Sequence, residues 1–137
     1  MSLPALFAVS ATTEGVTVRV QPSYAADQSD PENGHWVWHY HIRIENGDGM
    51  GIQIIDRHWV ITDGRGDRRD VMGEGVVSEQ PRIAPGGSFD YVSGCHFPTP
   101  SGHMQGRFGV LDSAGRRFEV EIPGFDLISP DSRRAAH

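Results

Sequence analysis

The sequence has no lysine, one cysteine and no long apolar run. All 12 basic residues among its 137 are arginine, and Cys95 is the only cysteine, which excludes an intramolecular disulfide. No segment approaches the roughly 18–20 apolar residues of a membrane span. Residues 1–9 have no basic region, so we expect no signal peptide and a cytoplasmic location.

The charge balance is acidic, with a formal net charge of -6. Such a chain repels nucleic acid and anionic lipid, so we expect neither as a partner. Genomic compositional bias explains the use of arginine alone. The alternative explanation is functional: arginine binds phosphate or carboxylate through two parallel hydrogen bonds, and lysine does not.

The strongest periodic signal lies in residues 35–45. Aromatic and β-branched residues occupy every second position: Trp36, Trp38, Tyr40, Ile42 and Ile44. Strict alternation of this kind predicts a half-buried strand.

Similar alternation predicts further strands at residues 16–20, 52–62, 89–91, 104–110 and 118–122. In residues 52–62 the alternation slips, since Ile52 and Ile54 share one phase whereas Trp59 and Ile61 share the other. One inserted residue, a β-bulge, explains the slip.

Turns rich in Asn, Asp and Gly separate these runs, and the 17 glycines and 9 prolines leave little room for helices. We predict one all-β domain over residues 1–128, an immunoglobulin or fibronectin type III-like sandwich of about seven antiparallel strands, with a small barrel as the alternative. Residues 129–137 are expected to form a disordered tail. The alternating charges of residues 63–70 predict a solvated loop.

Eight blocks of sequence follow in order over about residues 12–128. They are VRVQPSY (18–24), YHIRIEN (40–46), DRHWVITD (56–63), GEGVV (73–77), EQP (79–81), SGC (93–95), PSGHMQG (100–106) and EIPGF (121–125). Together they resemble the ApaG family of bacterial proteins.

The resemblance implies a fibronectin-type sandwich and links the chain to cobalt resistance and magnesium efflux. Related eukaryotic domains belong to an F-box protein and a DNA-polymerase-interacting protein. This usage favours a non-enzymatic module that binds a protein or a small ligand.

The family has a Gly-x-Gly-x-x-Gly segment proposed as a pyrophosphate loop. Here its positions hold Gly73, Gly75 and Ser78, so serine replaces the third glycine. Phosphate loops of this kind also use a following helix, and Pro81 disfavours one here. Binding or hydrolysis of a pyrophosphate-containing nucleotide through these three residues is therefore an alternative function, and a Gly-rich connection is the simpler interpretation.

His39 and His41 lie on one face of the predicted strand, as a metal-binding pair would. Further ligands would have to come from His35, His58 or His103, none of which has a diagnostic spacing. Divalent metal binding is the other alternative function, although we predict no metal site and no cofactor.

Cys95 and His96 would point to opposite faces of a strand, so we predict no catalytic residue and no enzyme. We expect a protein partner of unknown identity, a nucleotide or pyrophosphate compound as the alternative ligand, and homodimer formation as a further alternative. The expected contact surfaces are residues 97–102, which combine Phe97 with two prolines, and residues 73–78.

Overall fold

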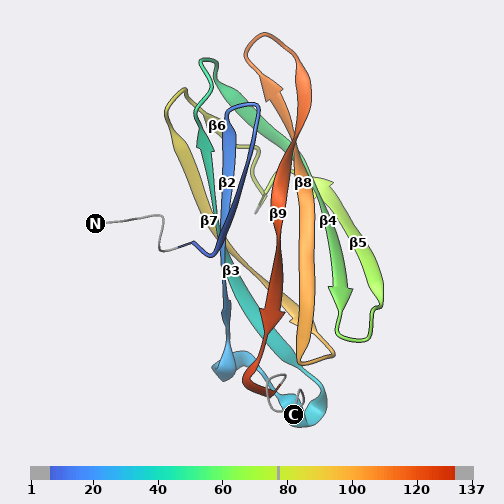
Figure 1. Ribbon diagram of the computed structural model, residues 1–137. Helices are drawn as coiled ribbons and strands as arrows, with labels where there is room; N and C mark the ends of the chain where they lie inside the picture. The colour runs from blue at the N-terminus through green and yellow to red at the C-terminus, as the bar shows by residue number, and fades with distance from the viewer. Residues whose placement is uncertain (1–6, 77, 132–137) are drawn as a thin grey trace, which may run out of the picture.

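The computed structural model describes residues 7–76 and 78–131, and these form two antiparallel sheets packed face to face (Figure 1). The all-β sandwich predicted from the alternation is therefore confirmed. The first sheet has the order β1-β2-β3-β7: β1 (Val9–Thr13), β2 (Val16–Tyr24), β3 (Trp36–Asn46) and β7 (Ser88–Phe97). The second has the order β5-β4-β8-β9, and β6 also pairs with β4: β4 (Ile52–Asp63), β5 (Arg68–Glu74), β6 (Arg82–Ile83), β8 (Ser101–Asp112) and β9 (Arg117–Ile128).

Two short 3-10 turns, η2 (Ala26–Gln28) and η3 (Pro31–Asn33), connect β2 to β3. Among the described residues no helix has the length and apolar character needed to cross a membrane.

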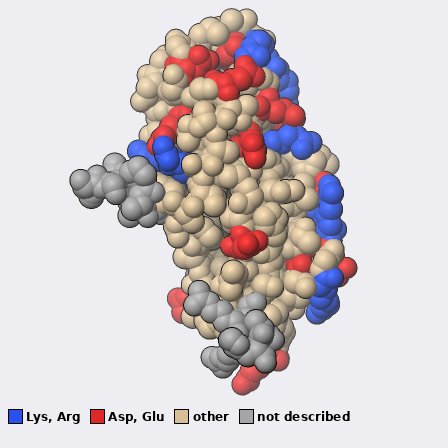
Figure 2. Space-filling view, viewed as in Figure 1, with Lys and Arg blue, Asp and Glu red and all other residues tan. Residues whose placement is uncertain are grey.

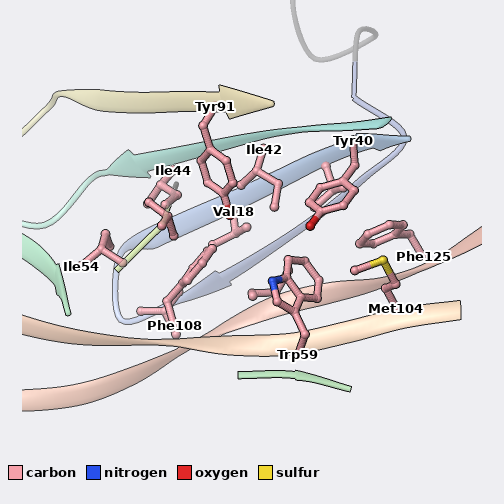
Figure 3. Close-up of a cluster of buried hydrophobic side chains, with 14 of the residues drawn as sticks. Val18, Tyr40, Ile42, Ile44, Ile54, Trp59, Tyr91, Met104, Phe108 and Phe125 are labelled. Atoms are coloured by element: carbon pink, nitrogen blue, oxygen red, sulfur yellow. The ribbon is translucent and has the colours of Figure 1, made fainter. Parts of the chain in front are cut away.

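The core lies between the sheets and consists of the alternate side chains that the sequence predicts. On β3, Trp38, Tyr40, Ile42 and Ile44 are buried, while the residues that alternate with them remain partly exposed. Side chains of both sheets interdigitate across this layer, as Figure 3 shows for Tyr40 above Trp59. Each such large apolar side chain contributes roughly 1.5–3 kcal/mol by leaving water, so these strands carry most of the stability.

The β-bulge predicted in β4 is present. Ile54 pairs with Val110 and Asp56 pairs with Gly109, so Ile55 is the extra residue. The bulge resets the alternation, and Trp59 and Ile61 join Ile52 and Ile54 in the core.

The described residues form nine strands rather than about seven. The prediction of a charged loop at residues 63–70 is partly wrong, because Arg68, Arg69 and Asp70 begin β5. Its residues are almost all exposed, so the sequence of β5 lacks the alternation of apolar residues that predicts a half-buried strand. Pairing with β4 holds it in place instead.

The two lateral sides of the sandwich differ. On one side β9 contacts β1 and β2, and the Glu121 amide donates a hydrogen bond to Thr13 Oγ1 at 3.1 Å. On the other side β5 pairs only with β4 and β7 pairs only with β3 among the described strands. We call this the open side.

The first residues of the predicted tail pack against the domain. Ser129 is buried and its amide donates to Pro100 O, while Asp131 accepts a hydrogen bond from Trp36 Nε1 at 3.0 Å. The remaining tail residues, 132–137, lie outside the described part of the chain.

Asn46 is a buried polar residue that holds the β3–β4 connection. Its Nδ2 donates to Met50 O and Ile83 O at 2.8 and 3.1 Å, and its Oδ1 accepts from the Asp48 amide at 3.0 Å. These bonds satisfy its side chain at a site that is 1% exposed.

We therefore expect Asn46→Ala to lower the free energy of unfolding by about 2–3 kcal/mol, because it leaves buried backbone groups without partners. Urea denaturation measures the change. Asn33→Ala is the matched control, since Asn33 is exposed, and should change stability by less than about 0.5 kcal/mol. Equal effects of the two substitutions would contradict the role assigned to Asn46.

Candidate functional site

A cleft of about 380 Å³ lies on the open side, where the two sheets diverge. It is lined by the facing parts of β5 and β7 and by residues of β3, β4 and β8 between them: Tyr40, Arg57, Trp59, Ile61, Arg69, Val71, Ser93, Gly94, Cys95, His96 and Met104. A smaller hollow of about 150 Å³ adjoins it and shares Ile61, Arg69 and His96. The two form one groove along the open side, and Asp63, Asp67 and Arg68 line its smaller hollow.

The lining of the cleft includes aromatic and apolar core residues. The rings of Tyr40 and Trp59 meet edge to face at 5.5 Å, and both are buried, as is Met104. A ligand there would contact rigid apolar surface, as is usual for binding pockets.

Arg57 faces this cleft because of the bulge. Beyond Ile55 the inward phase of β4 comprises residues 57, 59 and 61. The Arg57 guanidinium donates through Nη1 to the carbonyl oxygens of Glu74 and Gly75, each at 3.0 Å. It has no carboxylate partner among the described residues, so its charge is not neutralised.

Arg69 is the second cation of the cleft. It pairs with Ile61 across the β4–β5 ladder, which places its side chain on the inner face. Within the described part of the chain its side chain makes no hydrogen bond or ion pair. The lining contains no Asp or Glu, so the cleft is locally cationic in a chain of net charge -6.

The outer face of the second sheet is different. A hollow of about 420 Å³ there shares Arg57 with the cleft and also contains Arg107 and Arg117, which pair with Glu119 and Asp56. Figure 2 shows this mixture as arginines and acidic residues interspersed along the edge near β5.

His58 and Asp70 belong to the same outer network. Arg107 donates to His58 Nδ1 at 3.0 Å, so the proton of this ring lies on Nε2, which faces Asp70 at 2.7 Å. Hydrogen bonds from Arg68 and His58 lower the pKa of the Asp70 carboxyl to about 2. These charges neutralise one another, unlike those of the cleft.

Cys95 lies in the cleft on the inner face of β7. Burial raises the pKa of its thiol to about 12, and the nearby charge of Arg69 offsets only part of the rise. Burial likewise raises the pKa of Tyr40, and a hydrogen bond to Ser93 opposes it. The His96 imidazole stacks on His35 at 4.6 Å. Cys95 is therefore kept as a neutral thiol with no imidazole as its base.

The predicted phosphate-loop residues lie at the end of β5 and just beyond it. Gly73 pairs with Arg57, and a Cβ at Gly73 would lie 2.9 Å from Arg57 Nη1. Gly75 has φ +60°, and a Cβ there would lie 1.8 Å from Glu79 O. Ser78 has φ +68°, which explains why glycine suits this position in the family motif.

Three backbone amides of this segment, those of Gly75, Val76 and Glu79, already donate hydrogen bonds. Gly75 N–H donates to Ile55 O at 2.6 Å, and Val76 and Glu79 exchange hydrogen bonds at 2.7 and 2.8 Å. A phosphate would compete with those carbonyls, so binding at Gly73, Gly75 and Ser78 stays a prediction.

The candidate metal ligands do not converge in the structure. His39 Nε2 lies 3.0 Å from Gln28 Oε1, whereas His41 Nε2 lies 2.8 Å from Asp90 Oδ1. His35 pairs with His96 and His103 with Asp126. Among residues 7–76 and 78–131, no three His, Cys, Asp or Glu side chains are grouped so as to hold a metal ion.

The second predicted contact surface, residues 97–102, is less accessible than the sequence suggests. Phe97 is 1% exposed and packs edge to face on Trp38. Thr99 is buried, accepts a hydrogen bond from Gly64 N–H and donates one to Ser101 O. Phe97 and Thr99 therefore serve packing and the turn, whereas Pro98 is exposed and lines the smaller hollow, and a partner contact at residues 97–102 stays a prediction.

Arg57 and Arg69 are functional candidates that no sequence motif marks. They lie 12 positions apart, and only the β4–β5 hairpin brings them to one cleft. The slip in the alternation of β4 carried the signal for Arg57, since it puts residue 57 in phase with Trp59. Nothing comparable marked Arg69.

Comparison with known proteins gives a consistent result. The sequence model of the family described as the ApaG domain matches residues 26–112. Proteins named Protein ApaG from Rhodospirillum centenum and Allorhizobium ampelinum are 48% and 47% identical over 124 residues, which is 90% of this chain and 95% of theirs. Their names carry no enzyme designation.

A solved structure of the ApaA protein from Bordetella pertussis superposes with a TM-score of 0.82 at 45% identity. The match covers 84% of this chain and 94% of that one.

The geometry of the glycine segment leads to a stability prediction. We expect Gly75→Ala to destabilise the protein by about 2 kcal/mol or more, because it combines left-handed backbone with a clash against Glu79 O. Ser78→Gly should stabilise it by about 1 kcal/mol by relieving the same backbone strain. Urea denaturation of both variants tests this, and a stabilised Gly75→Ala variant would refute it.

The raised pKa of Cys95 leads to a prediction on reactivity. A pKa near 12 leaves about a thousandfold less thiolate than the ordinary value of 9.0 at neutral pH. Alkylation by iodoacetamide at pH 8 should thus be about 10³ times slower in the native protein than in urea. Rates within tenfold of each other would show that Cys95 is not desolvated.

Proposed function

This chain belongs to the ApaG family, and on that premise we propose that it is a non-enzymatic binding module that takes a protein partner on the open side of its sandwich. The observation that carries the proposal is the inner face of β5, which the first sheet leaves uncovered beside the free edge of β7. Unpaired edges and exposed apolar side chains are common marks of a contact surface.

Exposed apolar residues support this assignment. Of the five large apolar residues described as exposed, three lie on the two edge strands of the open side. Val71 faces the groove, whereas Met72 and Val92 lie beside it on the outer faces of their sheets, opposite His58 and His41. Val92 is 61% exposed in the middle of β7. The groove between these strands supplies the concave surface that a partner segment needs.

The family link to cobalt resistance and magnesium efflux fits an indirect role. In this proposal the chain acts on metal homeostasis through its partner and not through a metal site of its own. The separate hydrogen-bonded pairs of His39 and His41 support that division.

We expect Val92→Lys to weaken partner capture about tenfold or more, because a contact there would have to desolvate the new charge. The measurement is crosslinking from a cell extract with wild-type and variant proteins, scored by loss of specific bands. Ile128→Lys is the matched control, since Ile128 is 51% exposed on β9. Equal capture by wild type and Val92→Lys would refute the proposed surface.

A further inference from the structure

The overhang of β5 shows where an additional strand would fit. Trp59 and Ile61 on β4 are buried, but their partners on the same face of β5, Val71 and Arg69, are exposed. The first sheet ends at β7 and does not cover them. A strand added beyond β7 would cover the inner face of β5.

The edge of β7 has backbone groups available for such a strand. Val37 O accepts from Ala25 N–H and therefore points toward β2, whereas Asn46 N–H donates to Gly87 O, toward β7. Backbone groups alternate in direction along a strand. Because Val37 pairs with His96, the N–H and C=O groups of residues 90, 92, 94 and 96 point away from β3 into solvent.

We propose that an extended acidic segment of the partner adds to β7 and places two carboxylates against Arg57 and Arg69. This rests on the proposed function and specifies the chemistry of its partner. Arg57 lies opposite Gly73, four residues from Arg69 along β5, which is a separation of about 13 Å. Residues i and i+4 of an added strand have the same spacing and face, so the segment reads acidic-x-apolar-x-acidic.

The chemistry of the cleft selects this ligand. The guanidinium groups lack carboxylate partners within the described residues and can form parallel hydrogen bonds to a carboxylate. Val71 lies between them on β5 and is 37% exposed, which suits the central apolar side chain. Salt screens the net charge of -6 beyond about 8–10 Å. Asp63 and Asp67 line the adjoining hollow, so the acidic segment is expected in the larger cleft, whose lining has no Asp or Glu.

The test uses the full chain and two blocked peptides, acetyl-Thr-Glu-Thr-Val-Thr-Glu-Thr-amide and its counterpart with Gln in place of Glu. Amide and arginine Nε–H resonances are followed by NMR during titration. We expect the Glu peptide to shift the amides of Val92 and Gly94 and the Nε–H signals of Arg57 and Arg69. Arg69→Gln should weaken its binding about fivefold or more.

Arg82→Gln is the matched charge control, because Arg82 is exposed at the opposite end of β4, where β6 pairs, and it should bind like wild type. Val92→Pro and Met72→Pro compare the two free edges. Each removes an N–H that points into solvent, which edge strands tolerate. Only Val92→Pro should abolish binding, and thermal melting confirms that each variant is folded.

Equal affinity for the Glu and Gln peptides would overturn the inference, and so would an equal loss of peptide binding in Met72→Pro and Val92→Pro. Saturation of the same arginine signals by inorganic phosphate alone would also overturn it. Shifts that depend on protein concentration would indicate a second copy of the chain as the occupant and would overturn it too. Loss of capture by Val92→Lys alongside any of these would leave the proposed function standing and refute only its acidic specificity.

Discussion

One inserted residue in β4 decides which side chains face the interior of the sandwich. Without the bulge at Ile55, the alternation begun by Ile52 and Ile54 would turn Trp59 and Ile61 into solvent. With it, Trp59 packs on Tyr40 and the guanidinium of Arg57 enters the open side of the core. The register of β5 follows from β4, so the position of Arg69 depends on the same residue. Core, edge and cleft thus share a single cause, and the cost of an interrupted ladder is offset by the burial of large side chains.

The sequence predicted the parts of the fold that are stabilised by burial. Alternation of apolar residues located β3 and even the bulge in β4, because a half-buried strand must alternate. It failed for β5, whose charged residues are held by backbone pairing and not by burial. The cleft was missed for the same reason, since Arg57 and Arg69 meet only through a hairpin and neither belongs to a recognisable motif. The motif that was visible, around Gly73 and Gly75, lies beside the cleft and has its own structural explanation.

That explanation connects the glycines to Arg57. Gly73 leaves room for the guanidinium, and the carbonyls of Glu74 and Gly75 accept its hydrogen bonds. The turn at Gly75 directs those carbonyls toward Arg57 while its own amide stays in the ladder with β4. Backbone carbonyls orient a cation without neutralising its charge, whereas a carboxylate would do both. The segment therefore holds Arg57 in a form that still attracts an anion.

Selective use of ion pairs gives this acidic domain a local preference for anions. Arg19, Arg68, Arg107, Arg116 and Arg117 each contact a carboxylate on the surface, where such pairs contribute little to stability. In each of these pairs the carboxylate cancels the local electrostatic field of its arginine. Among the described arginines, Arg57, Arg65, Arg69 and Arg82 have no carboxylate partner, and of these Arg57 and Arg69 line one cleft beside an unpaired strand. Because screening limits electrostatic attraction to about 8–10 Å, these two charges dominate at the cleft, whose lining has no Asp or Glu, even though the whole chain carries -6. Backbone pairing on β7 would then supply affinity, and the two arginines would decide which extended segments are accepted.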